Sequence, residues 1–524
     1  MNAIQIVWFK RDLRIRDHRP LAEAAASGSV FPLYVFEPDL WQQPEWDETH
    51  FRFVSDSLKE LDHGLQKLGL RLTCRVGDVV DVMADIRSRH EIVAVHSHEE
   101  VGGKWTFDRD LRVGGWLRSH GIPWLEYPQC GVMRGLRNRD GWASHWKRWM
   151  GQPQAEMPAR AMGIESERGM VIPNPSDIHV RGGGDTACQA GGESNAHTLL
   201  DSFLQSRGRG YRTAMSSPRT AESQCSRLSP YIAWGCITIK QVHQAVRAKM
   251  NEIAEVKSED KEIDRGFSRS LTSYQSRLSW HCHFMQKLDD EPELEFHNLN
   301  RAYDGMREDD FRSDYFDRWC QGRTGYPMID ACMRYLHHHR WINFRMRAML
   351  MSFAAYHLWL HWREPAVYLA RHFLDFEPGI HFPQVQMQSG VTGINTIRIY
   401  SPVKQAMDQD PDGAFVRRWI PELEHVPKPW IFEPWKMGND DQVRFRCRID
   451  RDYPSPIVDH RDAVSKAKER IYALRRSEQA MSSAQRVYEK HGSRKNRDPL
   501  PTKRKRSPST QQPLLPGMED DISQ

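Results

Sequence analysis

The first 130 residues alternate short apolar runs with amphipathic segments, and this alternation restricts the fold more than any other feature of the sequence. The apolar runs are IQIVWF, VFPLYVFE, LRLTCRVG, EIVAVHSH and PWLEYP, at residues 4–9, 30–37, 70–77, 91–98 and 123–128. Strands that alternate with amphipathic helices form a parallel sheet covered on both faces. We therefore predict a doubly wound α/β domain over residues 1–150, with a ligand crevice to which the turn after WFKRD contributes.

The chain of 524 residues is too long for one compact core, so further domains are expected. Residues 151–197 are rich in Gly, Pro and Ser and lack periodicity, which predicts an interdomain linker. Long periodic segments with few strand signals predict an all-α domain over residues 198–492. Residues 493–524 join a basic block to an acidic end among Pro and Ser, which predicts a disordered tail.

Cysteine usage and hydropathy exclude several classes of protein. The nine cysteines include no CxxC pair and no zinc or iron–sulfur spacing, so we expect no metal and a reducing compartment. No apolar run approaches 18 residues and the chain begins without a signal-peptide pattern, so we expect no membrane contact and a cytoplasmic protein. A net charge of +5 is too small to predict the type of binding partner, which depends instead on local patches of charge.

Residues 319–364 predict two buried helices with an unusual charge pattern. The first helix is expected to start at Pro327, and after a corner at Arg340 the second is expected to run for about twenty residues. No Asp or Glu occurs between Arg334 and Glu364, although arginines do. Because an unpaired buried charge costs several kcal/mol, these guanidinium groups require anions. Nearby carboxylates and the phosphates of a ligand or nucleic acid are equally compatible with the pattern.

The segment SRLSPYIAWG offers a second candidate anion site. Ser226 and Ser229 bracket two residues just ahead of a predicted helix, where hydroxyls and free backbone amides can meet an anion. The same residues can also serve as a simple helix cap. The residues alone favour the cap.

Taken together, these and other segments resemble the photolyase and cryptochrome family. They are WFKRDLRIRDHRPL (8–21), SRLSPYIAWGCI (226–237), GRTGYPMIDACMRYL (322–336), RWINFRMRAMLMSF (340–353), HWRE (361–364), DPDGAFVRRWIPEL (410–423), EPW (433–435) and YPSPIVDHRDA (453–463). The resemblance covers roughly residues 4–495 in the family's order. It is far more specific for the family than for one activity within it.

The resemblance implies that the helical domain binds FAD. By family position Arg347 and Asp375 form an ion pair beside the flavin ring, where a cation favours the anionic reduced flavin. An antenna pigment in the first domain is also implied, but Gly102 and Gly103 replace the amide and carboxylate of folate-binding members, so its identity stays open. The residues expected to contact FAD are Tyr211, Ser226, Arg227, Leu228, Ser229, Trp341, Arg347, Asp375 and Glu377.

The resemblance further implies damaged DNA as the partner, with an altered lesion pocket. Trp280 matches a pocket tryptophan, but Arg277 replaces the glutamate expected three residues earlier. Phe344 replaces an asparagine, and Met387 stands in place of a second pocket tryptophan. A flipped lesion can still stack on such a pocket, because stacking needs no fixed hydrogen-bond code.

Other family positions concern the DNA backbone. Arg345 and Arg398 match residues that hold phosphates, so we expect both to bind DNA.

The family's chain of three tryptophans for flavin reduction is incomplete. Trp362 matches the middle ring, whereas Val385 stands where the flavin-proximal tryptophan is expected. Trp359 and Tyr356 offer a substitute cluster with Trp362 on successive turns of one expected helix. Simple core packing, with flavin reduced by a diffusible donor, explains the same rings equally well.

These implications give a ranked set of functions. The first is light-driven, FAD-dependent repair of UV-induced pyrimidine dimers by a monomer, and the second is a cryptochrome-like blue-light photoreceptor without repair activity. A light-independent nucleic-acid-binding protein ranks last, because Arg347 and Asp375 are kept.

Overall fold

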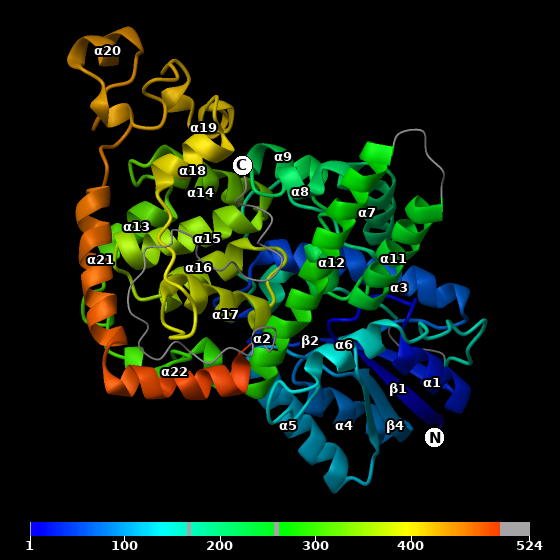
Figure 1. The fold of residues 1–524 in the computed structure, drawn as a ribbon. Coiled ribbons are helices and arrows are strands. Elements are labelled where there is room, and N and C mark those ends of the chain that lie inside the picture. The colour runs from blue at the N-terminus through cyan, green and yellow to red at the C-terminus, as the bar shows by residue number, and fades with distance from the viewer. Residues whose placement is uncertain (1, 165–168, 256–260, 493–524) are drawn as a thin grey trace.

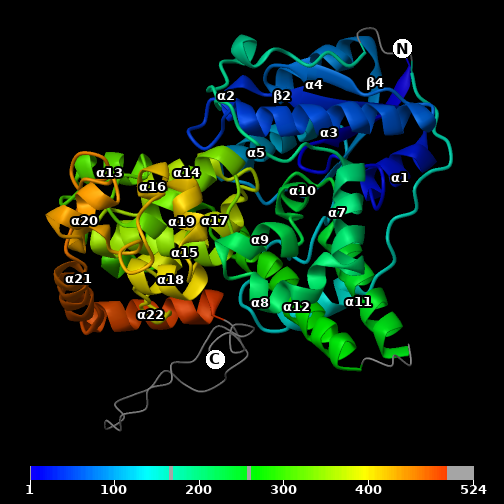
Figure 2. The same cartoon turned by 90° about the horizontal axis from the view of Figure 1, so that it is seen from above.

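The computed structural model describes residues 2–164, 169–255 and 261–492. An α/β part that contains the N-terminus packs against a larger helical part, as Figures 1 and 2 show from two directions. The predicted tail, 493–524, lies outside the described residues.

A five-stranded parallel sheet with the order β3-β2-β1-β4-β5 forms the centre of the α/β part. The side chains of β1 alternate between two cores, because successive residues of a strand point to opposite faces. Val7 and Phe9 join one core, and Ile6 and Trp8 join the other. All five expected strands are present, as β1 Ala3–Phe9, β2 Val30–Phe36, β3 Thr73–Val76, β4 Glu91–His98 and β5 Trp124–Tyr127.

Helices cover both faces of this sheet, which confirms the doubly wound prediction. Leu21 of α1 and Phe51 of α3 belong to the first core, whereas Met83 of α4 and Leu117 of α5 belong to the second. The helices of this part are α1 Arg19–Ser27, α2 Pro38–Trp41, α3 Glu48–Lys67, α4 Val79–Arg89, α5 Lys104–Ser119 and α6 Trp142–Met150.

The second half of segment 151–197 lies across both parts of the molecule. Arg52 of α3 donates a hydrogen bond to Thr186 Oγ1 at 2.9 Å, and the amide of Ala187 donates to the carbonyl of His338 at 2.8 Å. The predicted linker therefore contributes contacts between the two parts as well as connecting them.

The helical part confirms the all-α prediction, with no strand among its described residues. The longest helix, α12, borders the α/β part in Figure 1. No helix in the described ranges has the length and apolar character that crossing a membrane requires. The helices are α7 Glu193–Gln205, α8 Tyr211–Ala214, α9 Pro218–Gln224, α10 Ser229–Ala233, α11 Ile239–Glu255, α12 Lys261–Asp290, α13 Ser313–Cys320, α14 Pro327–His339, α15 Phe344–Ser352, α16 Arg363–His372, α17 Pro378–Ser389, α18 Pro402–Gln409, α19 Ala414–Trp419, α20 Asn439–Arg444, α21 His460–Arg475 and α22 Glu478–His491.

The prediction of a helix of about twenty residues after Trp341 is wrong. The predicted corner at Arg340 is present, and this residue has a φ of 54°. Helix α15 ends at Ser352 and continues only as the π-helical turn Phe353–His357. The amide of Leu358 then bonds the carbonyl of Phe353, and that of Leu360 bonds the carbonyl of Ala354. These widening hydrogen bonds unwind the helix.

Three arginines of this stretch meet carboxylates of the chain itself. Arg334 binds Glu422, Arg347 binds Asp375, and Arg340 binds Asp47 of the α/β part at 2.9 Å. Of the two anion sources that the sequence left open, carboxylates of the chain therefore account for these three arginines.

Candidate functional site

A cavity of about 360 Å³ lies between α12, α15 and α17. Leu228 does not line it, because its side chain is fully buried in the core. The cavity brings together the other residues expected to contact the cofactor, namely Tyr211, Ser226, Arg227, Ser229, Trp341, Arg347, Asp375 and Glu377.

One end of the cavity combines a cation, an aromatic ring and hydroxyl groups. The Arg227 guanidinium lies 4.1 Å from the centroid of the Trp341 ring, and its Nη2 donates to Gln189 Oε1 at 3.0 Å. Trp341 Nε1 donates to Ser229 Oγ at 3.3 Å. A held guanidinium beside two serine hydroxyls is a suitable environment for a phosphate group.

A bidentate ion pair marks the other end. Arg347 Nη1 and Nη2 lie 3.0 and 2.9 Å from Asp375 Oδ1 and Oδ2, and Arg347 Nε donates to the carbonyl of Ile342 at 2.7 Å. The guanidinium also lies 4.1 Å from the Phe373 ring centroid. Because the Asp375 side chain is only 4 % exposed, Arg347 supplies most of the compensation that its charge needs.

Beside this pair, Glu377 faces His281 of α12. His281 Nε2 lies 2.9 and 3.2 Å from the two carboxylate oxygens of Glu377. Burial acts to lower the pKa of His281, but the charge and hydrogen bond of Glu377 outweigh it, and the pKa is raised. The sequence did not single out this residue, because a histidine inside a predicted helix carries no signal of its contact with Glu377.

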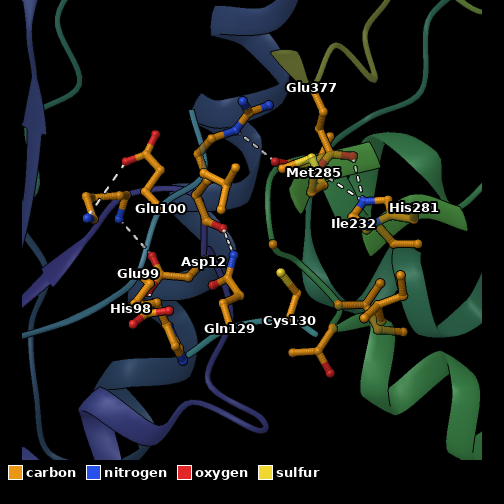
Figure 3. Close-up of a pocket in the computed structure, with 18 of the residues that line it drawn as sticks. Asp12, His98, Glu99, Glu100, Gln129, Cys130, Ile232, His281, Met285 and Glu377 are labelled. Carbon is orange, nitrogen blue, oxygen red and sulfur yellow. Dashed lines mark hydrogen bonds and ion pairs between the residues drawn. The ribbon is translucent and has the colours of Figure 1, made fainter. Parts of the chain in front are cut away.

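The same pair separates the main cavity from a smaller one. Figure 3 shows His281 and Glu377 on one side of a space of about 60 Å³, with Asp12 and His98 of the α/β part on the other. Asp12 Oδ2 accepts hydrogen bonds from His98 Nδ1 at 2.7 Å and from His18 Nε2 at 3.0 Å. His18 Nδ1 accepts from the amide of Leu21, so these three polar side chains form a hydrogen-bonded network.

His381 of α17 is a second residue that sequence reasoning missed. It lines the main cavity, and its Nε2 donates to the carbonyl of Ala366 at 2.8 Å. Burial lowers the pKa of His381 to about 4, so the ring is neutral at pH 7. No charge signal in the sequence distinguishes such a neutral histidine from a core residue.

Aromatic and cationic side chains line the more accessible part of the cavity, which we call the mouth. It comprises Arg277, Trp280, Phe344 and Arg345, and Phe344 is 38 % exposed. Trp280 packs against Phe284 with ring centroids 5.8 Å apart. Three of the predicted lesion or DNA contacts therefore lie together with Arg277.

Two further predicted residues lie elsewhere. Met387 is half-buried but does not line the cavity, whereas its neighbours on α17, Gln384, Val385 and Gln388, do. Arg398 lies in the loop after α17, also outside the cavity-lining residues, and its carbonyl accepts a hydrogen bond from Ser352 Oγ.

The two tryptophans predicted to carry electrons have different surroundings. Trp362 is fully buried, and its Nε1 donates to Asn298 Oδ1 at 2.7 Å. Trp359 lies beyond the helix break with a φ of 54°, and two guanidinium groups, of Arg307 and Arg470, lie 4.5 and 4.9 Å from its ring centroid. Removal of an electron would place positive charge beside two cations, which disfavours Trp359 as a carrier.

A third cavity, of about 390 Å³, lies between the two parts of the molecule. Its walls include Trp8, Trp41, Trp46 and Trp234. Phe376 lines both this cavity and the main one, so only one side-chain layer separates them there. Because Trp8, Trp41 and Trp46 belong to the α/β part, this cavity borders the part in which the resemblance implies an antenna pigment.

The main cavity fits the cofactor implied by the sequence. Arg227 with the serine hydroxyls suits a diphosphate, and the apolar walls with the Arg347 and Asp375 pair suit a flavin ring. Asn343 lines this space, and its buried Oδ1 has no hydrogen-bond partner among the described residues, which is consistent with a donor supplied by a ligand.

Comparison with known proteins gives consistent matches. Residues 5–134 match the family model described as DNA photolyase, and residues 274–473 match the FAD binding domain of DNA photolyase. A deoxyribodipyrimidine photo-lyase of Alkalihalophilus pseudofirmus is 26% identical over 490 residues, which cover 89% of this chain and 97% of the relative. Cryptochrome-2 of Arabidopsis thaliana is 29% identical over 501 residues, 88% of this chain and 77% of the relative.

Solved structures give the same result for the fold. A bacterial class III photolyase from Agrobacterium tumefaciens has a TM-score of 0.76 at 25% identity, covering 91% of this chain and 98% of that one. The cryptochrome of Synechocystis has a TM-score of 0.77 at 22% identity, covering 90% and 99%. Both domain models, in the expected order, and relatives matched over most of their length show that the chain belongs to the photolyase and cryptochrome family of FAD-binding flavoproteins.

Proposed function

We propose that the protein repairs UV-induced pyrimidine dimers in DNA with blue light. The observation that carries this proposal is the continuity of one cavity, from the Arg347 and Asp375 pair to a mouth lined by Trp280 and Phe344. A base flipped from the helix can enter such a mouth and stack on its aromatic rings.

The residues around the cavity have separable roles in this proposal. FAD supplies light absorption and the transferable electron. Arg347 favours negative charge on the bound cofactor, and Asp375 holds the guanidinium in place through two hydrogen bonds. Trp280 and Phe344 exclude water around the flipped lesion, and Arg345 holds a DNA phosphate.

The competing candidate is a blue-light photoreceptor that does no chemistry on DNA. Arg277 favours it, because this cation lines the mouth where the resemblance implies a glutamate. Relatives of both kinds match the chain over most of its length, so the test must separate the two functions directly.

A repair assay does so when the flavin is chemically reduced before illumination, because the route of reduction then does not matter. Oligonucleotides with one cyclobutane dimer or one (6-4) product, in single strands and duplexes, are exposed to blue light or kept dark. We expect light-dependent restoration of the cyclobutane dimer. Light-dependent change of flavin absorbance without repair of either lesion would contradict the proposal and favour a photoreceptor.

A further inference from the structure

Helix α17 presents two glutamine side chains to the cavity that make no hydrogen bond to the described part of the chain. Gln388 is only 7 % exposed, yet neither its amide oxygen nor its nitrogen has a hydrogen-bond partner in the described part of the chain. The Oε1 of Gln384, one turn earlier on the same face, is buried and also has no partner. Both side chains line the space that we assign to cofactor and lesion.

A third glutamine of the same helix, Gln386, has a side-chain amide whose hydrogen bonds are all made within the protein. Gln386 points away from the cavity, and its Nε2 donates to the carbonyls of Leu294 and His297 at 2.7 and 2.8 Å. Its Oε1 accepts from the amide of Leu299 at 2.6 Å. Buried polar groups in folded proteins are almost always satisfied in this way, so the orphaned Oε1 of Gln384 stands out, and the Gln388 amide beside it is available to a ligand in the cavity.

The position of the two amides along α17 favours the lesion over the flavin ring as that ligand. The helix starts next to Glu377, at the ring end of the cavity. At 1.5 Å per residue, Gln384 and Gln388 lie about 10 and 16 Å further along the axis. The closely hydrogen-bonded pairs at the ring end, Arg347 with Asp375 and His281 with Glu377, already define the flavin environment.

We propose that Gln384 and Gln388 recognise the base edges of a flipped cyclobutane pyrimidine dimer, an inference that rests on the repair function proposed above. A carboxamide offers one acceptor and two donors in a plane. Each ring of a thymine cyclobutane dimer presents an N3–H donor next to a C4=O acceptor, so one amide pairs with one ring through two hydrogen bonds. Reading a flipped base by this edge needs no change in the aromatic stacking.

The same chemistry predicts discrimination between lesions. The 3′ ring of a (6-4) product is a pyrimidone, which has no N3–H. An amide oxygen facing it stays unpaired in a buried site, and sites built to bond a donor reject analogues that lack it. We therefore expect the protein to bind the cyclobutane dimer more tightly than the (6-4) product.

The test measures binding of labelled oligonucleotides to the FAD-loaded protein in the dark, at one salt concentration, by fluorescence anisotropy. Gln384→Met and Gln388→Met remove the amide at nearly constant volume. Gln485→Met, an exposed glutamine of α22, is the matched control. Unfolding temperature and FAD content establish that each variant is folded and loaded.

Each cavity variant is expected to lose about tenfold in affinity for the cyclobutane dimer, as removal of an amide pair predicts, with undamaged DNA bound as before. The preference over the (6-4) product should shrink, and the control should match the parent. The inference is overturned if dimer affinity is unchanged, if damaged and undamaged DNA weaken equally, or if FAD content falls while dimer affinity stays. A parent that binds dimer and undamaged DNA alike overturns the repair proposal first, and this inference with it.

Discussion

Arg347 and Asp375 are held in a single geometry by contacts on every side of the guanidinium. Two hydrogen bonds join it to the carboxylate, a third joins Nε to the carbonyl of Ile342, and the Phe373 ring lies against its face. Such a cation is preorganised, so no reorganisation is needed when negative charge develops nearby. This pair is the most completely defined part of the candidate site.

Arg347→Ala should weaken flavin binding and destabilise the protein. The change leaves a buried carboxylate without its cation, which costs about 3–5 kcal/mol in comparable ion pairs. We expect a lower flavin absorbance per protein and a lower free energy of unfolding in denaturant.

The matched control is Arg334→Ala. Arg334 makes a bidentate pair of the same kind with Glu422, but both side chains are partly exposed and lie outside the cavity. Its loss should cost at most about 1 kcal/mol and leave FAD content unchanged. Equal FAD content in the two variants would remove the Arg347 pair from the cofactor site.

Between α15 and α16 the structure departs most from what the sequence predicts. The corner at Arg340 could be read from the helix pattern, because the apolar period is interrupted there. The break at Trp359 could not, since the segment contains neither Gly nor Pro and the unwinding depends on hydrogen bonds of the π-helical turn. The break separates Trp359 from Trp362 and places it near Arg307 and Arg470.

This arrangement predicts unequal effects on photoreduction of the flavin. Trp362→Phe should slow it by about tenfold or more, equivalent to at least ~1.4 kcal/mol in the barrier, because Trp362 is buried with no Lys or Arg over its ring among the described residues. Trp359→Phe should have little effect, because nearby guanidinium groups oppose oxidation of that ring. Flavin absorbance under blue light with an external reductant measures both. Parental rates in the double variant would show that electrons enter by another path.

Alternation of apolar and polar residues was sufficient to predict the sheet, whereas the candidate site residues came from the family resemblance, and neither source gives the rotation of α17. All five strands follow apolar runs, and the ion pair of Arg347 with Asp375 follows the motif order. Met387 was placed by counting directly from Asp375. It lies about 100° around the helix from Gln388, which faces the cavity in its place. Only the packing of α17 determines that rotation.

For the molecule as a whole, the net charge of +5 says little about whether the protein binds DNA. The positions of individual arginines say more about such binding. Arg345 lies at the mouth, and Arg398 lies in the loop after α17. Arg340 has a different role, because its pair with Asp47 joins the two parts of the protein. Arginines of similar sequence context therefore differ in their surroundings: Arg340 joins the two parts of the protein, whereas we propose DNA contacts for Arg345 and Arg398.

Arg345→Glu and Arg398→Glu should each weaken binding to damaged and undamaged DNA together. Loss of one phosphate contact should lower the slope of log affinity against log salt by about one unit. Arg461→Glu is the control, an exposed arginine on α21 at the edge of the helical part away from α12 (Figure 1). A salt titration identical to the parent's for the Arg345 or the Arg398 variant would contradict the assignment of that arginine to the DNA interface.

In the proposed repair function, the cofactor and a flipped dimer share one continuous cavity. The fluorescence lifetime of the reduced flavin measures this proximity directly, because electron transfer to a dimer in contact competes with emission. We expect DNA with a cyclobutane dimer to shorten the lifetime, and undamaged DNA of the same sequence to leave it unchanged. An unchanged lifetime when the dimer DNA is fully bound would contradict this expectation.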